Sequence, residues 1–69
     1  MRLEQPFWDA FEDIVRREDI SINSLVSRIW TASPDGVNLS GAIRVFVLRY
    51  FWALANGRTP RVPPGSTER

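Results

Sequence analysis

The side chains able to do chemistry in this sequence are arginines, carboxylates and hydroxyls, because its 69 residues include neither histidine nor cysteine. A serine without a general base is a poor nucleophile, so no Ser-His-Asp arrangement is available. The acidic residues are scattered along expected solvent faces and lack the grouping of metal ligands. No glycine-rich phosphate-binding loop occurs in the sequence. We therefore predict that the protein is not an enzyme and uses no cofactor and no metal.

Arginine supplies all of the basic charge, and this charge is unevenly distributed. The formal net charge is +1, from nine basic and eight acidic residues. Residues 1–57 hold six arginines and seven acidic residues, which gives −1, whereas residues 58–69 hold three arginines and one glutamate, which gives +2. The net charge of residues 1–57 therefore gives no support to nucleic-acid binding.

The elements that must position these side chains are helices, since apolar residues recur at helical spacing. Helices are predicted over three ranges: 6–18, 22–32 and 39–55. Pro6 suits the first turn of the first helix, where its missing N–H costs nothing. Ser21 is suited to cap the second helix, and either Asn38 or Ser40 can cap the third.

The segments outside these helices have the composition of a strand, a turn and a tail. Residues 1–4 have extended character and are predicted to form the end of a strand. Ser33–Gly36 has proline second and glycine fourth, which is typical of a turn. Residues 58–69 contain prolines and show no periodicity. We therefore predict one domain over residues 1–57, followed by a disordered tail over residues 58–69.

The third predicted helix is apolar on almost every side, and such a helix is buried on most of its faces. A domain of this size buries only about 60% of its unfolded surface. Three tryptophans and four phenylalanines add to the area that needs covering. Only a second copy of the chain could cover it, so we predict a homodimer. Arg44 and Arg49 are expected on a narrow solvent face of this helix, or paired with acids of the first.

The sequence has no signal for export or for a membrane. Charges within the first four residues do not fit a signal peptide. The longest apolar stretch is about ten residues long and contains Arg49, so it is too short to cross a bilayer. We expect a cytoplasmic protein with no membrane partner.

Three stretches resemble the motifs of one protein family in their order and spacing. They are Phe7-Trp8-Asp9-Ala10-Phe11, Ser21-Ile22-Asn23-Ser24-Leu25-Val26, and Asn38-Leu39-Ser40-Gly41-Ala42-Ile43-Arg44-Val45-Phe46-Val47-Leu48. With Arg2-Leu3 ending the strand before them, the chain resembles the ribbon-helix-helix family of Arc-type repressors. The resemblance covers residues 2 to about 52 and is closest to a bacterial subfamily that has a third helix.

The resemblance implies an all-α, mainly helical fold, with a short N-terminal strand plus three helices in an intertwined homodimer. In this family the paired strands enter the DNA major groove, and the start of the second helix holds a backbone phosphate. Carried onto this sequence, the resemblance implies that Arg2 contacts a base. The phosphate contacts would come from Ser21, Ile22, Asn23 and Ser24. The function implied is that of a DNA-binding transcriptional regulator.

The apolar side chains are expected to form the core and the dimer interface. These residues are Leu3, Trp8, Phe11, Leu25, Val26, Ile29, Phe46, Val47, Tyr50 and Phe51. Trp30 follows Ile29 off the main apolar stripe, and it is a candidate anchor for another protein.

The N-terminal ribbon departs from the family pattern, because only Met1 precedes Arg2. A strand of four residues is short for pairing and for reading several bases. Either the native start lies upstream and the ribbon is truncated here, or the fold serves another purpose. The alternative function is therefore a protein-interaction module, an adaptor- or antitoxin-like helical dimer that has lost direct DNA readout. The expected partners are a second copy and duplex DNA, or a protein in the alternative.

Overall fold

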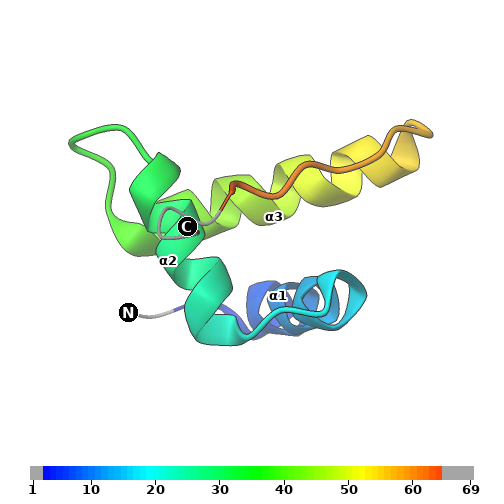
Figure 1. The fold of residues 1–69 in the computed structure, drawn as a ribbon, viewed down its shortest axis with the longest axis horizontal. Helices are drawn as coiled ribbons and strands as arrows, with labels where there is room; N and C mark the ends of the chain where they lie inside the picture. Colours follow the sequence, from blue (N-terminus) through cyan, green and yellow to red (C-terminus); the bar gives the residue numbers. More distant parts are fainter. Residues whose placement is uncertain (1–2, 65–69) are drawn as a thin grey trace.

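The computed structural model describes residues 3–64, and the regular structure within that range consists of three α-helices. Helix α1 spans Gln5–Glu18, α2 spans Ile22–Ala32 and α3 spans Leu39–Ala55 (Figure 1). The three predicted helices are therefore confirmed, and α1 begins one residue earlier than predicted. Residues 3–64 contain no strand, and the first two residues of the predicted strand lie outside this range.

Short-range side-chain hydrogen bonds fix the starts of α2 and α3. As predicted, Ser21 caps α2, and its Oγ accepts a hydrogen bond from the backbone N–H of Ser24 at 3.1 Å. Of the two caps considered for α3, the structure uses Asn38, whose Oδ1 accepts from the N–H of Gly41 at 2.7 Å. In the turn between α2 and α3, Gly36 adopts a φ of 89°, a conformation that favours glycine.

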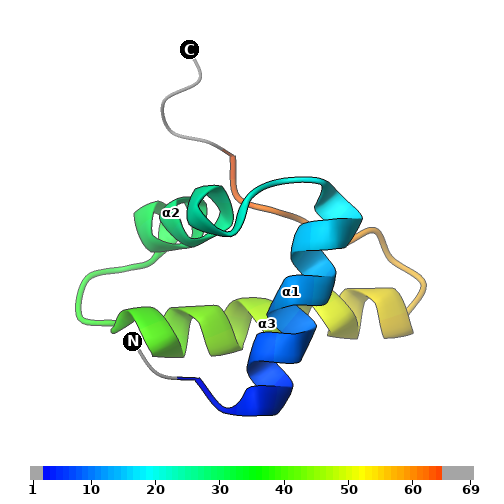
Figure 2. The ribbon, with the colours of Figure 1, turned by 90° about the horizontal axis from the view of Figure 1, so that it is seen from below.

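The three helices pack against one another around a single core, with α1 crossing α3 in Figure 2. All three contribute side chains that are buried within the protomer. These are Phe11, Ile14, Leu25, Ile29, Ala42, Ile43, Val47 and Tyr50. The middle of α3 supplies half of them, which agrees with its apolar sequence. No helix within residues 3–64 has the length and apolar character needed to cross a bilayer.

Two polar contacts tie the ends of α1 to α3. Arg44 donates two hydrogen bonds to the carboxylate of Glu4, at 3.0 and 3.1 Å, and its guanidinium lies 5.9 Å from the ring centroid of Phe7. The hydrogen bond from Arg44 holds the pKa of Glu4 below its ordinary value. At the other end of α1, the hydroxyl of Tyr50 donates to Glu18 at 2.6 Å. Arg44 therefore pairs with Glu4, the residue that precedes α1. Of the two expectations for Arg44, this agrees with pairing to an acid of the first helix.

Residues 58–64 form neither helix nor strand and run back from the end of α3 toward α2 (Figures 1 and 2). Within this segment Val62 packs against the core. Part of the C-terminal region thus lies on the helical body. The division into a domain over residues 1–57 and a disordered tail over residues 58–69 stays a prediction, and residues 65–69 lie outside the described range.

Candidate nucleic-acid interface

The start of α2 is the part of the expected DNA-contacting surface that falls within the described residues. Ser21, Ile22 and Asn23 are exposed, and Ser24 is half-buried behind them. The four residues expected to contact phosphate are therefore consecutive at one accessible helix end.

Two backbone N–H groups at this helix end have no acceptor between residues 3 and 64. The N–H of Ser24 is satisfied by Ser21 Oγ, and the N–H of Leu25 donates to the Ser21 carbonyl at 3.0 Å. Those of Ile22 and Asn23 donate to no backbone or side-chain oxygen in this part of the chain. Free N–H groups and the helix dipole both favour negative charge, so this helix end is chemically suited to a phosphate oxygen.

The charges near this helix end are mixed rather than basic. Asp19, an exposed acid, precedes the cap by two residues. In the last two turns of α1, Asp13 lies 3.1 Å from Arg17 and 3.6 Å from Arg16. Any anion at the start of α2 would thus be held by directed N–H groups more than by net positive charge. Across residues 3–64, no three acidic side chains come together as a metal site.

The described part of the chain begins at Leu3. Arg2, the expected base contact, lies outside the described residues, as does Met1. Leu3 is half-buried and packs against the core, and Glu4 is held by its ion pair with Arg44. The start of the described chain is therefore held by one apolar and one ionic contact.

The ten residues expected in the core and dimer interface divide into two groups within the protomer. Buried in the protomer are Phe11, Leu25, Ile29, Val47 and Tyr50. Half-buried at its surface are Leu3, Trp8, Val26, Phe46 and Phe51.

Three residues buried in the protomer lie outside the expected set of ten: Ile14, Ala42 and Ile43. Ile14 follows Phe11 by three positions, so helical spacing alone could have identified it. Ala42 and Ile43 had no such signal, because the apolar residues of α3 surround the whole helix.

An apolar stripe on α2 stays exposed in the protomer. Ile22 is 39% exposed and Trp30 is 53% exposed, and both share a face with the half-buried Val26 at four-residue spacing. We call these three residues the α2 stripe. Trp30 therefore lies at the surface, where a candidate anchor must lie, while its partner stays a prediction.

A second apolar stripe runs along α3 and was not singled out in the sequence. Val45, Leu48 and Trp52 are 50%, 58% and 63% exposed and share one face of the helix. We call these three residues the α3 stripe. The only signal in the sequence was that α3 is apolar on all sides. This pattern indicates that one apolar face of α3 stays exposed in the protomer, but it does not indicate which face.

Comparison with protein-family models matches residues 1–51 to the ribbon-helix-helix domain. The match takes in α1, α2, most of α3 and the segment before α1. Proteins with this domain are generally DNA-binding transcription regulators, typically dimeric and not enzymatic. No curated protein and no solved structure is significantly similar to the chain.

Proposed function

This chain belongs to the ribbon-helix-helix family, and on that premise we propose that it is a transcriptional regulator that binds duplex DNA as a homodimer. The observation that carries the proposal is the exposed, capped start of α2, where the N–H groups of Ile22 and Asn23 have no acceptor within residues 3–64. This is the chemistry that holds a DNA phosphate in position. We place the protein in the cytoplasm, together with the DNA that it would bind.

In the proposed dimer, the N-terminal strands of two copies pair antiparallel across a two-fold axis, and the helices intertwine beneath them. Such a strand is hydrogen-bonded only to its partner, so an isolated protomer has no sheet for it to join. The α2 stripe supports the proposal, because apolar side chains on an outward face gain free energy when a second copy removes them from water.

The proposed DNA contacts divide into those that position the protein and those that read sequence. Ser21 to Ser24 would hold backbone phosphate on each side of the two-fold axis. Arg2 would reach a base edge, where a bidentate pair with guanine is worth about 1–3 kcal/mol of discrimination. Affinity would therefore depend on both sites, while preference for a sequence would depend on Arg2.

The phosphate anchor is tested by removing one N–H group without disturbing the helix. Ile22→Pro deletes the N–H at the first helical position, where proline is well tolerated. The extended backbone of Ser21 (ψ 157°) also suits a residue that precedes proline. Losing one charge-assisted hydrogen bond per protomer should weaken binding to a pool of duplex DNA roughly tenfold or more. Fluorescence anisotropy of labelled duplex DNA at low salt measures the change in affinity.

Ile22→Ala is the matched control, since it removes the same side chain and keeps the N–H group. Both variants lose the apolar contact of Ile22, so Ile22→Ala should bind DNA roughly tenfold more tightly than Ile22→Pro. Raising the salt concentration should weaken binding by both the control and the unaltered protein, with a slope set by the phosphates engaged. Equal affinity of Ile22→Pro and Ile22→Ala, or binding that ignores salt, would rule out the proposed anchor.

A second candidate function is favoured by the exposed Trp30 and the mixed charge near the start of α2. In it, the helical dimer is a protein-interaction module, and Trp30 anchors a different protein. The two candidates differ in what covers Trp30. Trp30→Ala should abolish capture of that protein without altering the mass of the dimer, whereas a bait that retrieves only itself would exclude this candidate.

A further inference from the structure

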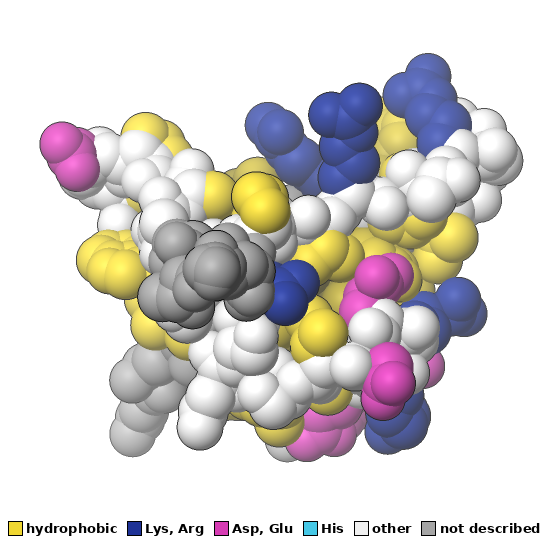
Figure 3. All heavy atoms as spheres, viewed as in Figure 1, with side chains coloured by type: hydrophobic (Ala, Val, Ile, Leu, Met, Phe, Trp, Pro, Cys, Tyr) yellow, Lys and Arg dark blue, Asp and Glu magenta, His cyan; other side chains and the backbone are white. Residues whose placement is uncertain are grey.

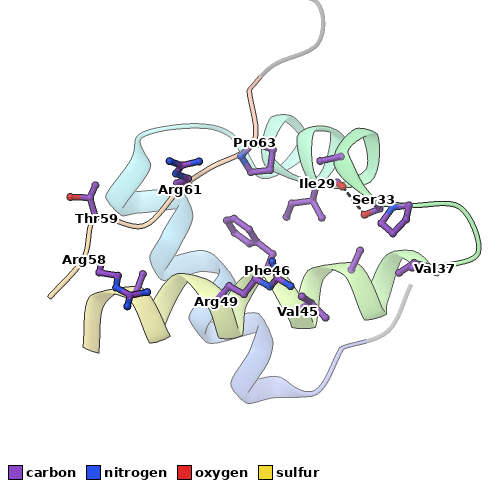
Figure 4. A pocket seen from close by; sticks show the side chains of 14 residues that line it. Ile29, Ser33, Val37, Val45, Phe46, Arg49, Arg58, Thr59, Arg61 and Pro63 are labelled. Carbon is purple, nitrogen blue, oxygen red and sulfur yellow. Dashed lines mark hydrogen bonds between the residues drawn. The ribbon is translucent and has the colours of Figure 1, made fainter. Parts of the chain in front are cut away.

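A cavity of about 660 Å³ lies between the second half of α2, α3 and residues 58–63 (Figure 4). Its floor is apolar: Phe46 projects from α3 between Ile29 and Pro63, and Val37 and Val45 continue the lining. The volume falls within the range of about 300–1,000 Å³ that is typical of small-molecule sites. Segments distant in the sequence thus border a half-open space large enough for an organic ligand.

Three arginines border this cavity. They are Arg49 of α3 and Arg58 and Arg61 of the C-terminal segment, and no acidic residue contributes to the lining. Within residues 3–64 none of the three pairs with a carboxylate, in contrast to Arg44 and both arginines of α1. Figure 3 shows a group of basic side chains along the upper right edge of the molecule, with others near its centre and among the acidic side chains at the lower right.

From this combination we infer that the cavity binds a small amphiphilic anion, an apolar body that carries one carboxylate or phosphate group. The apolar body would leave water for the floor around Phe46, which is favourable in proportion to the area buried. The acidic group would meet guanidinium groups, whose planar donors match carboxylate and phosphate oxygens. An anion would also reduce the mutual repulsion of three neighbouring positive charges.

This site is separate from the proposed DNA contacts. None of Ser21, Ile22, Asn23 or Ser24 lines the cavity, so the inference goes beyond the proposed function. The proposed cavity ligand and the proposed DNA binding can each be disproved without affecting the other. An acidic peptide segment would present similar charges, and the experiment below distinguishes it from a small ligand.

Calorimetric titration of the whole chain with decanoate, kept below its micelle concentration, tests the inference. Decyltrimethylammonium has the same chain with the opposite charge, and acetate has the same charge with almost no chain. We expect saturable binding of decanoate alone. The chemical shifts of the Phe46 and Thr59 amides, both from residues of the cavity lining, should move during the titration.

Removing the charges should weaken this binding. Arg49 and Arg61 are exposed, so the double variant R49Q/R61Q should fold and should bind decanoate roughly tenfold more weakly. The double variant R16Q/R17Q is the matched control, because it also removes two positive charges, both from α1 and outside the cavity lining. It should leave decanoate binding unchanged.

Three results would overturn the inference. Equal binding of decanoate and decyltrimethylammonium would show adsorption to apolar surface without charge selection. Equal weakening by R16Q/R17Q and R49Q/R61Q would show an effect of net charge alone. Saturable binding of a glutamate-rich peptide by a protein that does not bind decanoate would assign the site to a protein partner.

Discussion

Tyr50 is a buried residue whose hydroxyl reaches a charged partner. It is 4% exposed and donates a hydrogen bond of 2.6 Å to the Glu18 carboxylate. Burial, followed by the hydrogen bond and the negative charge of Glu18, raises the pKa of Tyr50 to about 12. The folded state thus favours the neutral phenol, because a phenolate would lose its hydration and face a carboxylate.

Alkaline pH should therefore destabilise the protein through this one side chain. The folded pKa lies above the ordinary value of 10.0, so the stabilisation is fully present below pH 10 and is lost as pH rises through about 12. The sequence has one tyrosine, no cysteine and no lysine, so no other side chain titrates between those values. Urea unfolding at a series of pH values, with phenolate absorbance recorded in parallel, measures the effect.

Tyr50→Phe is the control for this prediction. It should lower the unfolding free energy at neutral pH by about 1 kcal/mol, through the lost hydrogen bond. It should also remove the fall in stability between pH 10 and 12. A parallel fall in both proteins would show that another group is responsible.

At the scale of the elements, helix ends depend on residues that are close in the sequence. Ser21 and Asn38 both accept from an N–H three residues ahead, at 3.1 and 2.7 Å. The Asn38 side chain also accepts from the Ser40 hydroxyl at 3.2 Å. These interactions need no tertiary contact, which is why the sequence located α2 and α3 correctly.

Loss of the α3 cap should therefore cost stability. Asn38→Ala should lower the unfolding free energy by about 1 kcal/mol, since it leaves the Gly41 N–H without its acceptor. Asn38→Asp keeps an acceptor and adds a negative charge that the helix dipole favours. Its unfolding free energy should therefore lie within roughly a few tenths of a kcal/mol of that of the unaltered protein. Thermal unfolding followed by circular dichroism compares them, and equal stability of all three would contradict this role of the cap.

At the scale of the whole molecule, apolar surface on α2 and α3 remains exposed to solvent in the protomer. Five large apolar side chains of the α2 stripe and the α3 stripe are at least 39% exposed in the protomer: Ile22, Trp30, Val45, Leu48 and Trp52. A small domain gains stability by covering such surface with a second copy. The proposed dimer would do this at least for the α2 stripe.

The stability of the protein should therefore increase with its concentration. Dimerisation favours the folded state by mass action, so the unfolding temperature should rise between dilute and concentrated samples. Trp30→Arg should shift sedimentation toward the monomer, because it places a charge in the α2 stripe. Thr31→Arg, at the next and also exposed position, is the matched control and should stay dimeric. An unfolding temperature independent of concentration would argue against an obligate dimer.

The candidate functional surface could be predicted only in part from the sequence. The Ser21 cap at the start of α2 follows from the residue types. The family resemblance implies that this helix end contacts phosphate, and in the structure it is accessible to a ligand. The sequence carries no signal for the cavity beside Arg49, since Arg58 and Arg61 lie in a segment whose composition predicts disorder. Val62 packs that segment against the core and brings the three arginines to one site.

The sequence by itself determined the three helices and the Ser21 cap of α2, because capping hydrogen bonds and apolar spacing act over three or four residues. Only the tertiary structure decided which face of α3 is buried. That helix is apolar all round, so its sequence leaves the choice open, and packing against α1 and α2 buries Ile43 and Val47 while Val45 and Leu48 remain outside. The physical reason is that burial depends on neighbours distant in the chain, which local spacing does not encode.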